Sequence, residues 1–133
     1  KDWETILRLN VFGQMKMAEA FVGHVARSNQ KKIVTLTSML GSVGINRIGG
    51  LYAYRASKAA VNAMMKSMAI DLAKTHGIAA TALHPGWVRT DLGGPQADID
   101  AIASVAGMRK VIDALTLETA GRFWVYDGSE LPW

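Results

Sequence analysis

The run IVTLTS at residues 33–38 is short, rich in β-branched residues and mostly apolar. A run of this kind is typical of a strand buried in a parallel sheet. Two later runs are also short and mostly apolar, IAATAL at residues 78–83 and FWVY at residues 123–126. The second run stops at His84-Pro85-Gly86, because proline and glycine end a strand. We therefore predict strands over residues 33–37, 78–83 and 123–126.

Helical patterns separate these strands. Apolar residues at near-helical spacing predict a long helix over residues 3–28. A second helix is expected over residues 52–74, with Gly77 as its stop, and a third from about residue 99 or 104 to residue 117. The glycine-rich residues 39–51 are expected to form a loop. Alternation of helices and strands predicts an α/β fold, with a parallel sheet covered by helices on both faces.

The size of the chain suggests that this sheet is incomplete. With 133 residues, half of them hydrophobic, the chain can form one domain or part of one. The first predicted strand, residues 33–37, is apolar enough to expect neighbours on both sides. In an isolated copy one edge of a three-stranded sheet would stay unpaired, which favours association. The sequence therefore resembles half of a larger fold.

Composition excludes several classes of protein. The net charge of +4 comes from scattered basic residues, whereas nucleic-acid binding usually needs clustered ones. No apolar run approaches the about 20 residues that span a bilayer, and no cysteine is present for disulfides. We expect a soluble, cytoplasmic protein that binds neither nucleic acid nor membrane. The histidines His24, His76 and His84 lack metal-ligand spacing, so we expect them on the surface or in turns and predict no metal site.

The segment YRASK, residues 54–58, places Tyr54 and Lys58 one turn apart on the second helix. The ammonium would favour the phenolate and lower the tyrosine pKa from its reference value of about 10. Such a tyrosine can exchange a proton with a carbonyl or alcohol oxygen. Chance alone gives this spacing in about one chain in five of this composition, so the pair needs support from other residues.

Ser38 and Asn10 supply that support. Ser38 follows the first predicted strand, at the edge where open α/β sheets bind ligands, and its hydroxyl could bond a substrate carbonyl. Ser42 is a rival for this role, although it lies beyond Gly41 in the loop. Asn10 interrupts the first helix, and either an exposed position or the holding of a water near Lys58 explains it.

Together these residues resemble the active-site tetrad of the short-chain dehydrogenase/reductase family. The matching motifs are LNVFG around Asn10, VTLTSMLGS around Ser38, and YRASKAA with Tyr54 and Lys58. The segment HPGWVRT at residues 84–90 is similar to the family's Pro-Gly segment. Longer segments of the sequence, such as GGLYAYRASKAA and LHPGWVRTDLGGP, resemble the C-factor-like and sniffer-like carbonyl reductase branch of the family. The resemblance covers essentially all 133 residues.

The resemblance implies a role for each member of the tetrad. Tyr54 would exchange the proton with the substrate, and Lys58 would bind the nicotinamide ribose and lower the tyrosine pKa. Ser38 would orient the carbonyl, and Asn10 would anchor a water that relays protons. The resulting activity is hydride exchange between a carbonyl or alcohol compound and NAD or NADP.

The Pro-Gly segment would hold the cofactor together with Tyr54 and Lys58. The resemblance assigns cofactor contacts to Pro85, Gly86, Val88 and Thr90, with the backbone near Val88 and the Thr90 hydroxyl at the nicotinamide carboxamide. The loop over residues 87–97 and the third helix would line a mostly apolar substrate pocket. Arg89 and Asp91 either shape this loop or form an ion pair in solvent.

The family's glycine-rich dinucleotide turn does not occur in the sequence. The resemblance therefore implies one partial domain, residues 1–133, equivalent to the C-terminal part of a Rossmann-like doubly wound parallel sheet. Either the chain is part of an ordinary reductase, or it is a short protein that lost cofactor binding and serves interaction, signalling or oligomerisation. In the family, the helices here over residues 3–28 and 54–74 form the dimer interface, which implies a homo-oligomer.

Overall fold

The computed structural model describes residues 2–133, and three parallel strands form its centre. The strands are β1 (Lys32–Leu36), β2 (Ala79–His84) and β3 (Phe123–Val125), in the order β1-β2-β3. Leu36 pairs with Leu83 in the first ladder, and His84 pairs with Val125 in the second. The predicted α/β fold with a parallel sheet is confirmed, and each strand lies within one or two residues of its predicted range.

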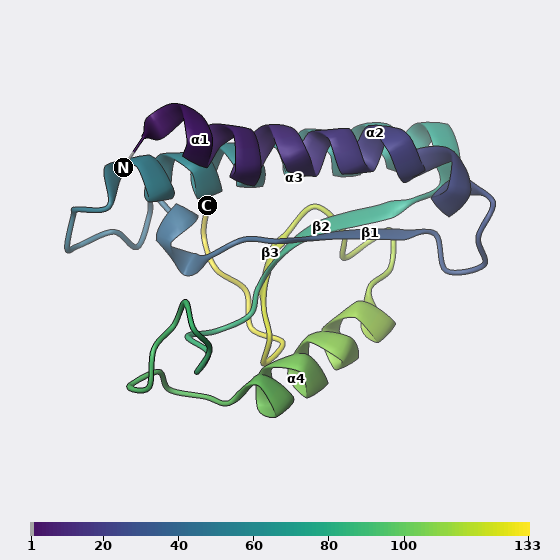
Figure 1. The fold of residues 1–133 in the computed structure, drawn as a ribbon. Coiled ribbons are helices and arrows are strands. Elements are labelled where there is room, and N and C mark those ends of the chain that lie inside the picture. The colour runs from purple at the N-terminus through teal and green to yellow at the C-terminus, as the bar shows by residue number, and fades with distance from the viewer. Residues whose placement is uncertain (1) are drawn as a thin grey trace.

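Helices cover both faces of the sheet. On one face lie α1 (Trp3–Leu7), the π-helical segment η1 (Arg8–Phe12), α2 (Gly13–Ala26) and α3 (Tyr52–His76). Helix α4 (Ala101–Ala114) lies on the opposite face, as Figure 1 shows. Crossover helices on both sides make the sheet doubly wound. No helix of the described residues is long and apolar enough to cross a membrane.

Local signals explain where the helices begin and end. The carboxylate of Asp2 accepts from the Glu4 amide at 3.0 Å and caps α1, and that of Asp100 accepts from the Ala103 amide at 2.7 Å and caps α4. Gly77 ends α3 in the left-handed conformation, at φ 63°. Helix α4 ends at Ala114 instead of residue 117, because buried Leu115 turns the chain into an extended conformation.

Two short segments differ from the prediction. The first helix is interrupted by η1, where the Gly13 amide bonds the Arg8 carbonyl five residues back. Such wide turns occur often at functional sites. The 3₁₀ helix η2 (Met39–Gly41) begins the region that was predicted as loop.

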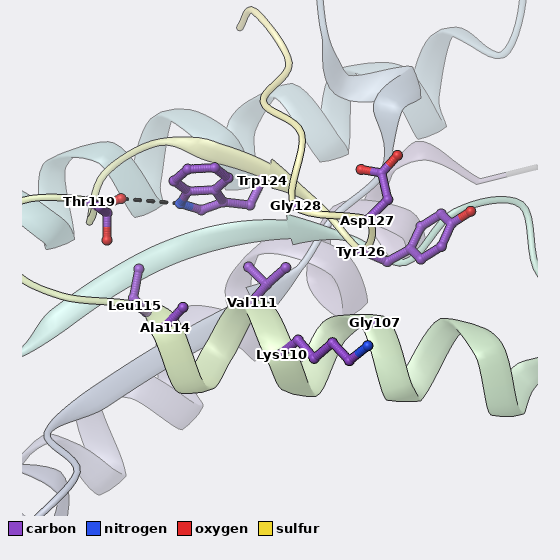
Figure 2. A pocket seen from close by; sticks show the side chains of 10 residues that line it. All are labelled: Gly107, Lys110, Val111, Ala114, Leu115, Thr119, Trp124, Tyr126, Asp127 and Gly128. Carbon is purple, nitrogen blue, oxygen red and sulfur yellow. Dashed lines mark hydrogen bonds between the residues drawn. The ribbon is translucent and has the colours of Figure 1, made fainter.

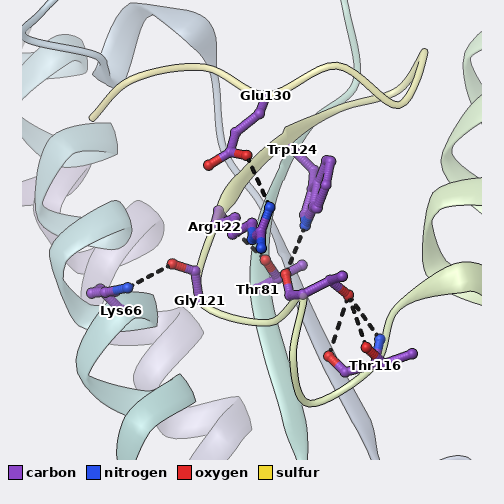
Figure 3. Close-up of polar contacts among 8 residues, drawn as sticks. Lys66, Thr81, Thr116, Gly121, Arg122, Trp124 and Glu130 are labelled. Atoms are coloured by element: carbon purple, nitrogen blue, oxygen red, sulfur yellow. Dashed lines mark hydrogen bonds and ion pairs between the residues drawn. The ribbon is translucent and has the colours of Figure 1, made fainter.

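The core lies between the sheet and α3. Its centre contains Val61 and Met65 from α3, Ala80 and Ala82 from β2, and Phe123 from β3. Thr81 Oγ1 donates to the Arg122 carbonyl at 2.8 Å, and Lys66 Nζ donates to the Gly121 carbonyl at 3.1 Å (Figure 3). These bonds fix the chain that leads into β3.

The outer edge of β1 is open. Within the described residues β1 pairs with β2 alone, and the Leu36 side chain is 47% exposed. At the other side of the sheet, Trp124 of β3 forms a bridge with Glu130 of the returning tail. The sheet therefore has one unpaired edge, as expected for this chain in isolation.

Candidate active site

A cavity of about 1200 Å³ lies at the carboxyl ends of β1 and β2. Open parallel sheets place their ligands at this edge. Most of the predicted site residues line the cavity, namely Ser38, Tyr54, Pro85, Gly86, Val88 and Thr90. Asn10 of η1 and Lys58 of α3 do not line it.

Tyr54 and Lys58 occupy successive turns of α3. Lys58 Nζ lies 5.8 Å from the centre of the Tyr54 ring and donates to the Leu36 carbonyl at 3.4 Å. Burial lowers the pKa of Lys58 from its usual value, because the low-dielectric surroundings disfavour the ammonium. The lysine therefore lies between the phenol ring and the end of β1.

The segment after β1 packs tightly against α3. A Cβ atom at Gly41 would lie 2.8 Å from the carbonyl carbon of Lys58, closer than real Cβ atoms approach. Arg55 of α3 adds hydrogen bonds to the carbonyls of Leu40 and Gly50, at 3.4 and 3.1 Å. Glycine at position 41 thus sets how closely Ser38 and the Tyr54 helix approach each other.

The two candidate serines have different surroundings. Ser38 lines the cavity, and its Oγ accepts from the Leu40 amide at 3.1 Å. Ser42 is 1% exposed, and its Oγ donates to the Pro132 carbonyl at 2.5 Å. Ser38 therefore faces the cavity, whereas the Ser42 hydroxyl is bonded to the C-terminal tail.

Asn10 is half-buried and contacts α3. Its Nδ2 donates to Ser57 Oγ at 3.0 Å, and Ser57 Oγ donates to the Tyr54 carbonyl at 2.8 Å. The interpretation of Asn10 as an exposed residue is therefore wrong. The sequence reading missed Ser57, which is fully buried and connects the π-helical segment to the turn that carries Tyr54 and Lys58.

The segment after β2 is held by its own hydrogen bonds. Gly86 has φ 86°, and a Cβ there would lie 2.8 Å from Ile99 Cδ1. Trp87 Nε1 donates to the Gly93 carbonyl at 2.9 Å, and Thr90 Oγ1 accepts from the Gly93 amide at 3.2 Å. Arg89 donates to the Ala97 carbonyl at 2.9 Å, so of the two interpretations of Arg89 the loop-shaping one is correct.

His84 is the second functional candidate that the sequence reading missed. It is 7% exposed, ends β2 and lines the cavity, so its expected position on the surface or in a turn is wrong. Burial lowers the pKa of His84, whereas the nearby Asp127 carboxylate acts in the opposite direction. Its position at the end of a predicted buried strand was the available signal.

A second cavity, of about 430 Å³, lies between α4 and β3 (Figure 2). The Trp124 indole forms part of its wall and donates to the Thr119 carbonyl at 3.1 Å. Lys110 and Asp127 supply charge, and Val111 and Leu115 supply apolar surface. None of the predicted site residues lines this cavity, so the candidate chemistry belongs to the larger one.

Comparison with known proteins gives consistent matches. A family model described as short chain dehydrogenase matches residues 1–101. The C-signal protein of Myxococcus xanthus is 42% identical over 99% of this chain and 79% of its own length. The 1-hydroxy-2-glutathionyl-2-methyl-3-butene dehydrogenase of a Rhodococcus species is 39% identical over 99% of this chain and 60% of its own length.

Solved structures of carbonyl reductases share the fold. The carbonyl reductase Sniffer of D. melanogaster has a TM-score of 0.88 and 36% identity over 96% of this chain and 55% of its own. The NADPH-bound carbonyl reductase from chicken fatty liver has a TM-score of 0.90 and 29% identity over 98% of this chain and 57% of its own. The chain thus spans little more than half the length of these reductases.

Proposed function

The chain belongs to the short-chain dehydrogenase family, and we propose that it forms the catalytic part of an NAD(P)-dependent oxidoreductase for carbonyl or alcohol compounds. Its three parallel strands and flanking helices form part of a Rossmann fold. One observation carries the proposal. Ser38 and Tyr54 line the same cavity at the carboxyl edge of the strands, and Lys58 Nζ lies 5.8 Å from the Tyr54 ring centre.

In this proposal each residue of the site has one task. A bound reduced nicotinamide would supply the hydride that the carbonyl carbon accepts. Tyr54 donates its hydroxyl proton to the carbonyl oxygen, which becomes the alcohol. Ser38 donates a hydrogen bond to the same oxygen and stabilises the charge that develops there. Lys58 stabilises the tyrosinate left behind, and Asn10 would hold a water from which the proton is restored.

The residues present fit one end of a dinucleotide. Pro85, Gly86, Val88 and Thr90 form a cavity wall on the segment that follows β2, and Gly86 brings its backbone there at positive φ. The glycine-rich turn that holds a pyrophosphate at a helix N-terminus does not occur in this sequence. We infer that a dinucleotide-binding part precedes residues 1–133 in the active protein, which we call the full-length reductase.

The cavity wall favours an uncharged, largely apolar substrate. Leu51, Trp87, Leu92 and Met108 lie along it, and no lysine or arginine does among the described residues. A carboxylate or phosphate group would therefore lose its hydration without a counter-charge. We propose an apolar carbonyl or alcohol compound.

The test is an assay of the full-length reductase with NADH and NADPH against a panel of uncharged and carboxylate-bearing carbonyl compounds. Turnover that prefers the uncharged compounds is expected, and no turnover with any of them contradicts the proposal. The 133-residue chain alone is expected to bind either dinucleotide weakly or not at all. Micromolar binding in a calorimetric titration would contradict the inferred need for a preceding part.

A second candidate is an interaction or signalling module without turnover. It is favoured by the 42% identity to a protein named C-signal and by the open edge of β1. In that case Tyr54→Phe would leave every measured property unchanged, whereas a reductase would lose turnover and keep its fold.

Homo-oligomerisation through the helices over residues 3–28 and 54–74 also remains a proposal. The outer face of these helices exposes large apolar side chains, including Leu9, Phe12, Met17 and Ile70. Exposed apolar patches of this kind mark association surfaces. Light scattering after size exclusion should give a dimer or larger species, and a monomer at micromolar concentration would contradict it.

A further inference from the structure

We propose that His84 is a ligand-binding residue of this site, whose ring Nε2–H donates a hydrogen bond to an uncharged acceptor oxygen in the cavity. The inference deepens the proposed function and rests on it. It adds a third hydrogen-bonding group to the two that Ser38 and Tyr54 provide. Four observations support it: burial, an unpaired nitrogen, the register of two strands and the position of one amide.

His84 is buried with a nitrogen that lacks a partner. The residue is 7% exposed and lines the 1200 Å³ cavity. Among residues 2–133, two buried side-chain polar atoms have no hydrogen-bond partner, Asn62 Nδ2 and His84 Nδ1. A buried polar atom without a partner destabilises a folded protein, so two such atoms call for an explanation.

The strand register places His84 on the face of the sheet that packs against α3, the helix that carries Asn62. Leu36 pairs with Leu83, and the Thr37 amide continues the ladder by donating to the Leu83 carbonyl at 3.0 Å. Thr37 and His84, the next residue on each strand, therefore lie beside each other. Because side chains alternate along a strand, His84 shares the face of Ala80 and Ala82, which pack against α3.

Thr37 fixes the amide of Asn62 on that face. Its Oγ1 donates to Asn62 Oδ1 at 2.7 Å, in a buried bond. The amide oxygen is thereby used, and the Nδ2 hydrogens remain as donors. A donor on Asn62 and a nitrogen lone pair on His84 are complementary. The two atoms make no direct hydrogen bond, so we assign them to each other through one bridging water.

This pairing decides the tautomer of His84. If Nδ1 accepts, the proton of the neutral ring must be on Nε2. Burial lowers the pKa of His84 and favours the neutral ring at neutral pH, against the opposing effect of Asp127. The neutral ring then presents its Nε2–H donor to the ligand. Such a donor suits a carbonyl or amide oxygen of the ligand and does not suit a cationic group.

The tautomer can be measured without any ligand. A ¹⁵N-correlated NMR spectrum of the protein at pH 7 should show a neutral His84 ring with the proton on Nε2. Asn62→Leu removes the donor to Nδ1, and it should shift the His84 ring toward the other tautomer. A wild-type ring that is protonated on Nδ1, or charged, would overturn the inference.

The ligand contact is tested in the full-length reductase with two matched variants. His84→Gln keeps a donor near the Nε2 position, and His84→Asn keeps a polar group only near the Nδ1 position. We expect His84→Asn to weaken ligand binding about tenfold, the equivalent of one hydrogen bond, and His84→Gln to restore most of it. Equal binding by wild type and His84→Asn would overturn the inference.

Two measurements distinguish whether the acceptor oxygen belongs to the dinucleotide or to the carbonyl substrate. A change in the Kd for NADH or NADPH identifies the nicotinamide amide oxygen, and a change in KM for the carbonyl compound alone identifies the substrate. Absence of all turnover in the wild type would refute the proposed function, whereas the tautomer measurement would still decide the assignment of His84.

Discussion

Gly41 packs against Lys58 so closely that a Cβ atom at position 41 would lie 2.8 Å from the lysine carbonyl carbon. The contact joins the segment that carries Ser38 to the helix that carries Tyr54 and Lys58. Neither atom of the contact belongs to a reacting group. The distance between the Ser38 segment and α3 therefore depends on Gly41, because only a residue without a side chain fits against Lys58.

Gly41→Ala should destabilise the fold, because the nearest atoms are the carbonyl group and the Cβ of Lys58, which are fixed by the helix backbone and cannot turn aside. Overpacking of this kind costs about 1–3 kcal/mol in the free energy of unfolding, measured by urea denaturation. Gly13→Ala is the matched control, since its Cβ would meet only the Arg8 carbonyl at 3.5 Å. The control should be neutral or stabilising by up to about 1 kcal/mol, because alanine favours helix. Equal effects of the two substitutions would contradict the packing argument.

Asn10 and Ser57 should be energetically coupled. Their hydrogen bond of 3.0 Å joins η1 to α3 across 47 residues of sequence. Asn10→Ala and Ser57→Ala should each cost about 1 kcal/mol of unfolding free energy. The double variant should cost less than the sum of the two, by about 0.5–1 kcal/mol. Strict additivity in thermal or urea unfolding would mean that the bond contributes nothing to stability.

Substitution of Ser38 should affect activity, and substitution of Ser42 should affect stability. Ser42→Ala breaks the bond from the buried Ser42 hydroxyl to the Pro132 carbonyl, so we expect a loss of about 1–2 kcal/mol of unfolding free energy with unchanged kcat per folded molecule. Ser38→Ala should lower kcat of the full-length reductase about 100-fold, as the loss of a donor to a developing oxyanion does. If Ser42→Ala instead lowered kcat more than Ser38→Ala, the two serines would have been assigned the wrong way round.

The buried His84 should make stability depend on pH. Its pKa in the folded protein is below the reference value of 6.5, so the unfolded chain binds the proton more readily. The contribution is complete above about pH 6.5 and is lost as the pH falls through the folded-state pKa. Urea denaturation at pH 7.5, 6.5 and 5.5 should show a steeper loss for wild type than for His84→Gln.

The exposed His76 provides the control for this pH series. His76→Gln should leave the slope of stability against pH as it is in the wild type. A wild-type slope that His84→Gln does not reduce would show that other groups produce the pH dependence.

The alternation of strands and helices could be predicted because it depends on local pattern. A β-branched run marks β1, a short apolar run before Pro85-Gly86 marks β2, and glycine marks the end of α3 at Gly77. The candidate site could be predicted where it follows a strand end or a helical spacing, as Ser38, Tyr54 and Lys58 do. These residues need only their near neighbours in sequence to be placed.

The missed features depend on contacts between distant segments. Ser57 is bonded by Asn10, which lies 47 residues earlier in the sequence, and Ser42 is bonded to the carbonyl of Pro132, which lies 90 residues later. The π-helical turn at residues 8–12 leaves the apolar spacing of the helix nearly unchanged. His84 precedes Pro85-Gly86, which suggested a turn, and its burial results from the packing of α3 and β3 around the end of β2.

Transfer of hydride in a single turnover tests the central claim most directly. The full-length reductase and its Tyr54→Phe variant would be mixed with reduced dinucleotide and carbonyl compound, and nicotinamide absorbance would be followed by stopped flow. At saturating dinucleotide, loss of the proton donor should slow the transfer at least about 100-fold, with an unchanged melting temperature. A variant that transfers hydride within threefold of the wild-type rate would contradict the role of Tyr54 and with it the proposed site.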